Sequence, residues 1–233
     1  MYILGLQKTS LLDYPEHVAS IVFTGGCNFR CPYCHNRDLV CSAQSMDEYS
    51  IKDILTHLKK RSAIYDGIVI TGEEPTLQPD LLEFLQLIRN HTSLDIKLDT
   101  NGTHPAMIQK AVESSLVDYI AMDIKQSQDK YHQIASMPVL DIQAIEASVD
   151  YLLEDHIPYE FRTTICDELF EKEDILAIGQ WIAGARAYFL QPYKETEQVI
   201  SPIYHAPSIQ TLKEYLQILQ PYVPHAALRG IDE

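Results

Sequence analysis

The chain has 233 residues, 46% of them hydrophobic, which is enough to form one large domain with its own core. Its formal net charge of −15 argues against a polyanionic partner, because nucleic-acid-binding proteins usually present a basic face. The N-terminal stretch MYILGLQKTSLLDYPEH lacks the basic flank and apolar run of a signal peptide, and no apolar run reaches the roughly 18 residues of a membrane span. We therefore expect a single cytoplasmic domain over 1–233, with neither nucleic acid nor membrane as a partner.

Strand-like and helix-like segments alternate along the chain. The predicted strands span 18–24, 66–72, 94–100, 117–125, 158–165 and 186–193, and the first of them, VASIVFT, is apolar and rich in β-branched residues. Helical periodicity follows each of them, over 51–58, from Pro79, from about 104, from about 141, from about 172 and over 208–220. Six βα units predict a parallel α/β sheet with right-handed crossovers, either an open partial barrel or a doubly wound sheet.

Three further predictions concern local structure. Ser45 and Glu48 have the spacing of a capping box for the first helix, and Pro79 is expected to open the second. The segment 126–140 is the least regular part of the chain and is predicted to be a mobile loop.

Three of the five cysteines, Cys27, Cys31 and Cys34, lie in one loop directly after the first predicted strand. A cytosolic compartment keeps thiols reduced, so metal ligands are favoured over disulfides. A structural zinc site takes four ligands, whereas an iron–sulfur cube held by three thiolates leaves one iron open. The alternative is a zinc site completed by His35. The other two cysteines, Cys41 and Cys166, are too few for a second four-cysteine cluster.

The spacing CxxxCxxC, with Tyr33 before the last cysteine, resembles the signature of the radical S-adenosylmethionine (radical SAM) enzymes. The stretch TGEEPTLQPDL at 71–81 is similar to the GGEP stretch of that family, and Gly72, Glu74 and Pro75 match it. Glu73 replaces the second glycine, so its side chain must point away or the cofactor must sit differently. Without the resemblance, the stretch would be an ordinary acidic turn before a helix.

This resemblance implies a partial (β/α)6 TIM-like barrel of the radical SAM type. It also implies that the three thiolates of the loop hold a [4Fe–4S] cluster whose fourth iron binds S-adenosyl-L-methionine, and that the enzyme cleaves this cofactor reductively. The role of the protein is to hold the cluster and the cofactor and to position them for this reaction.

A narrower resemblance rests on CHNRD (34–38), DTNG (99–102) and MDIK (122–125), which are similar to stretches of the activating enzymes of glycyl radical enzymes. The opening GLQKTSLLDYPEHVASIVFTGGCNFRCPYCHN and the later FRTTI and LQPY look most like activating proteins of anaerobic ribonucleoside-triphosphate reductase, and the resemblance covers about 3–195. It implies a glycyl radical enzyme as protein substrate and a flavodoxin- or ferredoxin-type electron donor.

The same resemblance assigns roles to single residues. A monovalent cation would be held by Asp99, Thr100, Asp123 and the main-chain carbonyl of Ala121, and oxygen ligands of this kind suit a hard cation. Contacts to the cofactor would come from Tyr33, Gly72, Glu73, Glu74, Pro75, Asp99, Asn101, Asp123, Lys125 and Arg162.

Each of these assignments has a plainer alternative. Asp99 and Asn101 could be ordinary turn residues, Lys125 a solvated strand end, and Arg162 the partner of a neighbouring carboxylate. For the whole protein, two other functions stay open at this point. One is a radical enzyme acting on a nucleotide-like or heterocyclic small molecule, and the other is a non-catalytic zinc-binding module.

Overall fold

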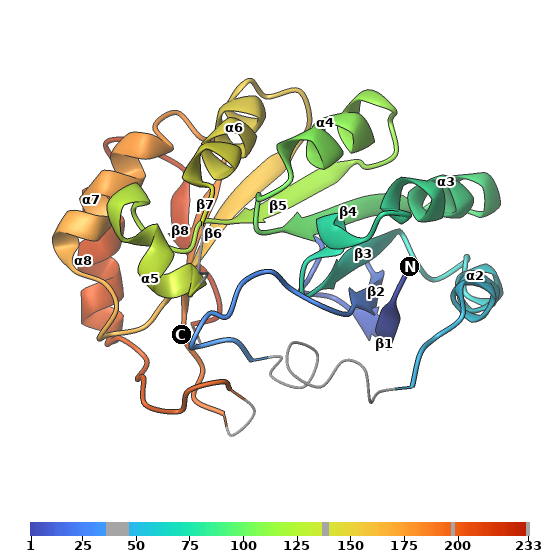
Figure 1. The fold of residues 1–233 in the computed structure, drawn as a ribbon, viewed down its shortest axis with the longest axis horizontal. Coiled ribbons are helices and arrows are strands. Elements are labelled where there is room, and N and C mark those ends of the chain that lie inside the picture. The colour runs from blue at the N-terminus through green and yellow to red at the C-terminus, as the bar shows by residue number, and fades with distance from the viewer. Residues whose placement is uncertain (36–46, 137–139, 197–198, 232–233) are drawn as a thin grey trace.

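The structure is a computed structural model that describes residues 1–35, 47–136, 140–196 and 199–231. One eight-stranded sheet runs through it (Figure 1). Its strands are β1 (Ile3–Ser10), β2 (Ala19–Thr24), β3 (Gly67–Gly72), β4 (Asp95–Thr100), β5 (Tyr119–Asp123), β6 (Tyr159–Ile165), β7 (Tyr188–Pro192) and β8 (Ala226–Leu228). The α-helices are α2 (Ile51–Lys60), α3 (Leu81–His91), α4 (Pro105–Glu113), α5 (Tyr131–Ala135), α6 (Ile142–Leu153), α7 (Lys172–Trp181) and α8 (Ile209–Leu219).

The strand order in the sheet is the order along the chain, from β1 to β8. β1 pairs with β2 antiparallel, and every later neighbouring pair is parallel. Because parallel crossovers are right-handed, strands added always in the same direction place their helices on one face of the sheet. Figure 1 shows the helices along the outer side of the curved sheet. The partial barrel is therefore confirmed over the doubly wound sheet, and among the described residues β8 does not pair back to β1.

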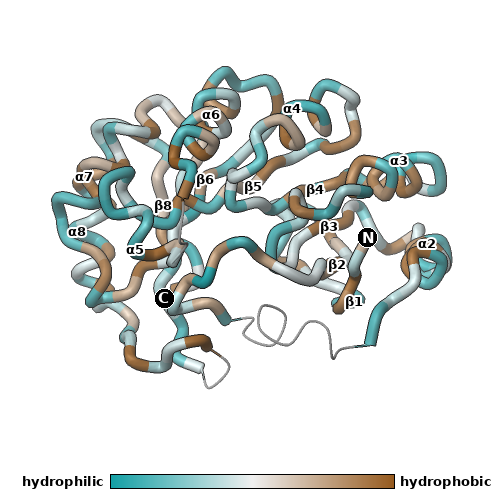
Figure 2. The backbone as a smooth tube through the Cα atoms, viewed as in Figure 1, coloured by the Kyte–Doolittle hydropathy of each residue, from teal (hydrophilic) through white to brown (hydrophobic). Residues whose placement is uncertain are grey.

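Two hydrophobic clusters fill the two faces of the sheet. The larger one lies between strands and helices and includes Ile68, Ile96 and Ile120 from neighbouring strands. A small one on the other face contains Tyr14, Ala19, Ile21 and Val69. The helices alternate hydrophobic and hydrophilic residues along their length (Figure 2). The concave face of the barrel therefore has little apolar packing of its own, and polar groups occupy the rest of it.

The six predicted βα units are present, with strand and helix ends shifted by a few residues. The capping box is wrong: α2 begins at Ile51, and its N-cap is Ser50, whose side chain accepts a hydrogen bond from the Asp53 amide. Ser50 meets the same chemical requirement directly before the first apolar residue. Glu48 precedes the helix, and Ser45 lies outside the described residues.

Two other local predictions also need correction. α3 begins at Leu81 with Asp80 as its N-cap, so Pro79 precedes the helix instead of opening it. Within 126–140, a 3-10 turn η3 (Gln128–Lys130) leads into α5. The buried apolar side of α5, which includes Tyr131 and Ile134, makes this part of the segment regular. Residues 137–139 are outside the described part of the chain.

No helix among the described residues has the length and hydrophobicity needed to cross a membrane.

Candidate active site

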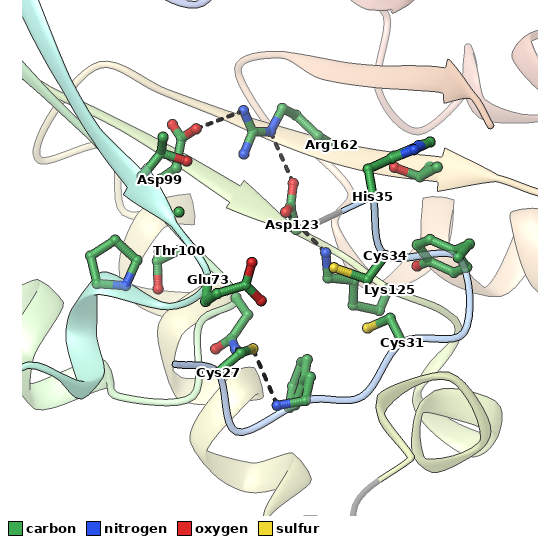
Figure 3. Close-up of a pocket in the computed structure, with 17 residues that line it drawn as sticks. Cys27, Cys31, Cys34, His35, Glu73, Asp99, Thr100, Asp123, Lys125 and Arg162 are labelled. Atoms are coloured by element: carbon green, nitrogen blue, oxygen red, sulfur yellow. Dashed lines mark hydrogen bonds and ion pairs between the residues drawn. The ribbon is translucent and has the colours of Figure 1, made fainter. Parts of the chain in front are cut away.

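A cavity of about 200 Å³ lies beyond the carboxyl ends of the central strands (Figure 3). This is the edge at which parallel α/β sheets carry their sites. The predicted residues that line it are Cys27, Cys31, Tyr33, Cys34, Gly72, Glu73, Pro75, Asp99, Thr100, Asn101, Asp123, Lys125 and Arg162. Residues not predicted as cofactor contacts also line it, namely Phe29, His35, Thr71 and Thr164. Glu74 and Ala121 are buried and do not line it.

The cysteine loop is held by main-chain hydrogen bonds to two distant segments. The Arg30 amide donates to the Ala135 carbonyl at the end of α5 (2.9 Å), and the Ser201 amide donates to the Pro32 carbonyl (2.8 Å). Neither contact could be read from the cysteine spacing, because both partners are more than 100 residues away in the chain. The loop is therefore positioned by the rest of the fold before any ligand binds.

The turn after β4 provides a third anchor. Asn101 donates from Nδ2 to Asn28 Oδ1 (2.8 Å), and Asn28 donates from Nδ2 to Thr103 Oγ1 (2.9 Å). Asn101 Nδ2 also lies 3.9 Å from Cys27 Sγ. Asn101 thus joins the cysteine loop to the DTNG turn, which is more than the ordinary turn role that its motif allows.

Burial favours the neutral form of two thiols of the loop, those of Cys27 and Cys31. Burial raises the pKa of Cys27 to about 12 and the pKa of Cys31 to about 11, although the charge of Lys125 acts against burial at Cys31. Metal ligands bind as thiolates, so loading of this loop must release protons.

The segment after β3 needs glycine at 72. Gly72 has a φ of +115°, and a Cβ there would lie 2.3 Å from the Thr24 amide nitrogen. The next residue, Glu73, turns its carboxylate into the cavity (Figure 3). The side chain of Glu73 therefore does not point away from the cavity, which was one of the two expectations for this departure from the family pattern. Its carboxylate adds a negative charge to the cavity wall.

A chain of ion pairs crosses the opposite wall. Arg162 lies between two carboxylates, with Nη1 3.2 Å from Asp99 Oδ2 and Nε 2.9 Å from Asp123 Oδ1 (Figure 3). Lys125 Nζ lies 3.0 Å from Asp123 Oδ2. Asp123 and Arg162 are paired in the register of β5 and β6, so the sheet itself brings them together.

The positive charges keep both aspartates ionised. Burial alone would raise the pKa of Asp123, but Arg162 and Lys125 outweigh it and lower the pKa to about 2. In the same way, Arg162 and Lys97 lower the pKa of Asp99 against the effect of burial. Sequence reasoning missed Lys97, whose signal was a lysine between two apolar strand residues, Ile96 and Leu98.

The predicted cation ligands are close together but already have partners. Asp99 and Ala121 are paired in the register of β4 and β5. Thr100 donates its hydroxyl to Glu74 (2.8 Å) and accepts from the Gly102 amide (3.1 Å). The carboxylates of Asp99 and Asp123 face lysine and arginine side chains, so each of these two predicted ligands already has a cationic partner.

The cavity does fit an iron–sulfur cluster with a zwitterionic cofactor. Three thiols from one loop reach it, and each could bind a different iron of a cube. Lys125 and Arg162 offer positive charge for a carboxylate. The phenol oxygen of Tyr33 is buried and has no hydrogen-bond partner among the described residues, which is unusual for a polar atom inside a folded protein.

Comparison with known proteins identifies the family. The profile of the radical SAM superfamily matches residues 21–176, more than half of the chain and all three loop cysteines. The chain belongs to the radical SAM superfamily. As a radical SAM protein it is an enzyme of a family that uses a [4Fe–4S] cluster and S-adenosylmethionine, and this membership replaces the alternative of a non-catalytic zinc module.

Curated relatives match nearly the whole chain. A protein of Methanocaldococcus jannaschii named as a glycyl-radical enzyme activating enzyme is 29% identical, and the match covers 98% of this chain and 95% of that protein. The pyruvate formate-lyase-activating enzyme of Listeria monocytogenes is 27% identical over 90% of this chain and 84% of its own length.

Solved structures agree on the fold alone, because their sequences are much less similar. The Streptococcus suis protein SuiB superimposes with a TM-score of 0.71 at 13% identity over 90% of this chain, and the chain spans about half (48%) of SuiB. QueE from Escherichia coli superimposes with a TM-score of 0.54 at 18% identity, over 99% of this chain and 94% of QueE.

Proposed function

We propose that this radical SAM enzyme activates a glycyl radical enzyme by removing a hydrogen atom from a backbone glycine of that partner. The observation that carries the proposal is the cavity in which three loop thiols face the pair Lys125 and Arg162, in a chain similar over 98% of its length to a protein named as an activating enzyme of this kind.

Each wall of the cavity would have its own part. Cys27, Cys31 and Cys34 would hold the cluster, leaving one iron for the amino-acid end of S-adenosylmethionine. Lys125 and Arg162 would bind its carboxylate, and the main-chain carbonyl of Tyr33 would meet the adenine edge. When both are bound, the cluster and the cofactor would supply the reductive cleavage of S-adenosylmethionine and a radical that can abstract a hydrogen atom. A loop of the partner would then close the cavity and exclude water.

We propose anaerobic ribonucleoside-triphosphate reductase as the partner. Its support is the resemblance of GLQKTSLLDYPEHVASIVFTGGCNFRCPYCHN, FRTTI and LQPY to activating proteins of that enzyme. A flavodoxin- or ferredoxin-type protein in the cytoplasm would supply the single electron that each cleavage consumes. The products would be methionine, 5′-deoxyadenosine and the partner's glycyl radical.

The test is an anaerobic activation assay with electron paramagnetic resonance. Cluster-loaded protein is incubated with S-adenosylmethionine, a reductant and anaerobic ribonucleoside-triphosphate reductase, and a glycyl radical signal is expected on the reductase. Pyruvate formate-lyase is assayed in parallel. A signal on pyruvate formate-lyase alone would show that the partner is wrong and that the reaction class is right.

Two controls sharpen this assay. A reductase whose radical-site glycine is replaced by alanine should give no signal. The rate of 5′-deoxyadenosine formation is measured with and without the partner, and equal rates would count against a protein substrate.

A further inference from the structure

Lys97 is the most deeply buried of the cationic side chains near the cavity. It lies on the concave face of β4, and only 1% of its side chain is exposed. Because successive residues of a strand face opposite sides, Lys97 and Asp99 share this face, while Ile96 and Leu98 pack toward the helices. The Lys97 ammonium meets Asp99 Oδ1 at 2.6 Å.

With Lys97, all four carboxylate oxygens of the two aspartates have a cationic partner. Asp99 Oδ1 faces Lys97, and Asp99 Oδ2 faces Arg162. Asp123 Oδ1 faces Arg162, and Asp123 Oδ2 faces Lys125. A monovalent cation at this point would have to share these oxygens with ammonium and guanidinium groups a few ångströms away.

Side-chain cations on this face are paired with its carboxylates. The charged side chains linked here through ion pairs and hydrogen bonds on β4 to β6 and at the end of β8 are the cations Lys97, Lys125, Arg162 and Arg229 and the carboxylates Asp99, Asp123 and Glu160. The cations of this set outnumber its carboxylates by one, and the carboxylate of Glu73 on the cavity wall balances that charge. A further cation at Asp99 would lie close to the Lys97 ammonium and the Arg162 guanidinium in a buried region, where charge repulsion is strong.

We propose that Lys97 is a positioning residue whose ammonium group supplies the positive charge at Asp99. By the family resemblance, a bound monovalent cation would otherwise supply this charge. S-adenosylmethionine binding by this enzyme is then independent of potassium and sodium. Lys97 cannot easily leave this place, because an ammonium buried away from water needs a partner and Asp99 is the partner it has.

The test is a titration of the reduced, cluster-loaded enzyme with S-adenosylmethionine, followed by the change in the cluster's electron paramagnetic resonance signal. It is run in potassium chloride and in tetramethylammonium chloride at equal ionic strength, so that charge screening is the same. We expect the wild-type dissociation constants to agree within about twofold, because no small cation takes part. A wild-type affinity that falls at least about tenfold without potassium and returns with potassium or sodium would overturn the inference.

The variant Lys97→Met keeps the length of the side chain and removes its charge. In tetramethylammonium we expect it to bind S-adenosylmethionine about tenfold more weakly than the wild type, since a charge-assisted hydrogen bond to Asp99 is lost. Potassium or sodium should restore much of this affinity, which a merely structural defect would not allow. Lys110→Met, which removes an exposed lysine of α4, is the matched control and should stay cation-independent.

Equal affinity of Lys97→Met and wild type in tetramethylammonium would also overturn the inference. If the variant does not fold or load its cluster, the wild-type comparison decides alone. The inference rests on the cofactor site of the proposed function, but the titration contains no partner enzyme. A failed activation assay and a potassium requirement are therefore separate results.

Discussion

Glu74 belongs to the most recognisable motif after the cysteines, yet it works from behind the cavity. Its side chain is fully buried and accepts hydrogen bonds from the Thr76 amide (3.0 Å), the Thr100 hydroxyl (2.8 Å) and the Asn101 amide (2.6 Å). These donors come from the segment after β3, from the last residue of β4 and from the turn that follows it, so one carboxylate connects two neighbouring walls of the cavity. Its role is comparable to that of a helix cap, in which a side-chain oxygen satisfies main-chain donors.

We predict that Glu74→Gln lowers the free energy of unfolding by about 2 kcal/mol, because one carboxylate oxygen becomes an amide group that cannot accept a hydrogen bond from a buried donor. Urea unfolding followed by circular dichroism measures this. Glu83→Gln, at an exposed position of α3, is the control and should change stability little. Equal stability of the two variants would contradict the role assigned to Glu74.

The cysteines divide by their place in the fold. Cys31 lines the cavity, whereas Cys166 is buried in the core outside it, where burial raises its pKa to about 12. We predict that Cys31→Ala loses the cluster and all S-adenosylmethionine cleavage, and that Cys166→Ala keeps both. Iron and sulfide content after anaerobic reconstitution measures the first effect. Loss of iron from Cys166→Ala would refute the ligand assignment. Cys41→Ala is also predicted to have little effect, and Cys41 lies outside the described residues.

At the scale of elements, the two strands that sequence reasoning missed lie at the two edges of the sheet. β1 carries Gln7, Lys8 and Thr9 on an exposed stretch, so it lacks the apolar run of the central strands. β8 has three residues, too few for any periodicity to appear. Both form because a neighbouring strand offers main-chain partners, which is information that neither segment contains by itself.

β8 brings Arg229 into the concave face. Its guanidinium makes two hydrogen bonds to Glu160 on β6 (2.7 and 2.8 Å) and stacks 3.6 Å from the centre of the Phe189 ring. Glu160 is fully buried and also accepts from the Tyr119 hydroxyl (3.0 Å). The end of the chain therefore supplies the countercharge for a carboxylate in the middle of the sheet.

We predict that Arg229→Met lowers the free energy of unfolding by about 3–5 kcal/mol, because it leaves Glu160 ionised and buried without its partner. The matched control is Arg186→Met, which breaks an exposed pair with Asp155 and should cost at most about 1 kcal/mol. Chemical denaturation of both variants measures the difference. Similar losses for the two would mean that β8 contributes little to the stability of the sheet.

For the whole molecule, the order of the strands explains why charge collects on the concave face. In the described part of the chain, the helices that follow the parallel strands lie on the outer side, so they bury the apolar residues of that face and leave the inner side chains of β4, β5 and β6 to one another. The ion pairs of Asp99, Asp123 and Glu160 connect these three strands and β8. The same arrangement makes the stability of the protein depend on pH.

Folding lowers the pKa of Asp123 to about 2, and it also lowers the pKa values of Asp99 and Glu160. A carboxylate of lowered pKa contributes its full stability above its ordinary pKa and loses it as the pH falls through the folded value. Glu74 acts in the opposite direction, because burial raises its pKa, so it favours the folded state at low pH and loses this contribution as the pH rises.

Three carboxyl groups have a lowered pKa in the folded protein, and one has a raised pKa. We therefore predict that the stability of the protein falls as the pH drops below about 4 toward about 2. Thermal unfolding of the cluster-free protein, followed by far-ultraviolet circular dichroism, measures it. Asp123→Asn should be less stable at neutral pH and should show a smaller decrease in acid. A melting temperature that stays constant from neutral pH into this acid range would contradict the prediction.

The sequence by itself determined the features that depend on neighbours along the chain. The spacing of Cys27, Cys31 and Cys34 is a local property of one loop, and the six βα units follow from hydrophobic periodicity within short segments. The helix cap was placed wrongly because Ser45 and Ser50 satisfy the same local rule. Only the structure shows which serine precedes the first helical turn.

Tertiary structure decided what depends on contacts between distant segments. It set the strand order, buried Glu74 behind the cavity, turned Glu73 into it, and brought Lys97 and Arg162 to opposite oxygens of Asp99. A lysine within a strand can be solvated or buried, and its spacing is the same in both cases. The surrounding strands exclude water from Lys97 and leave Asp99 as its partner, and this contact exists only once the sheet has formed.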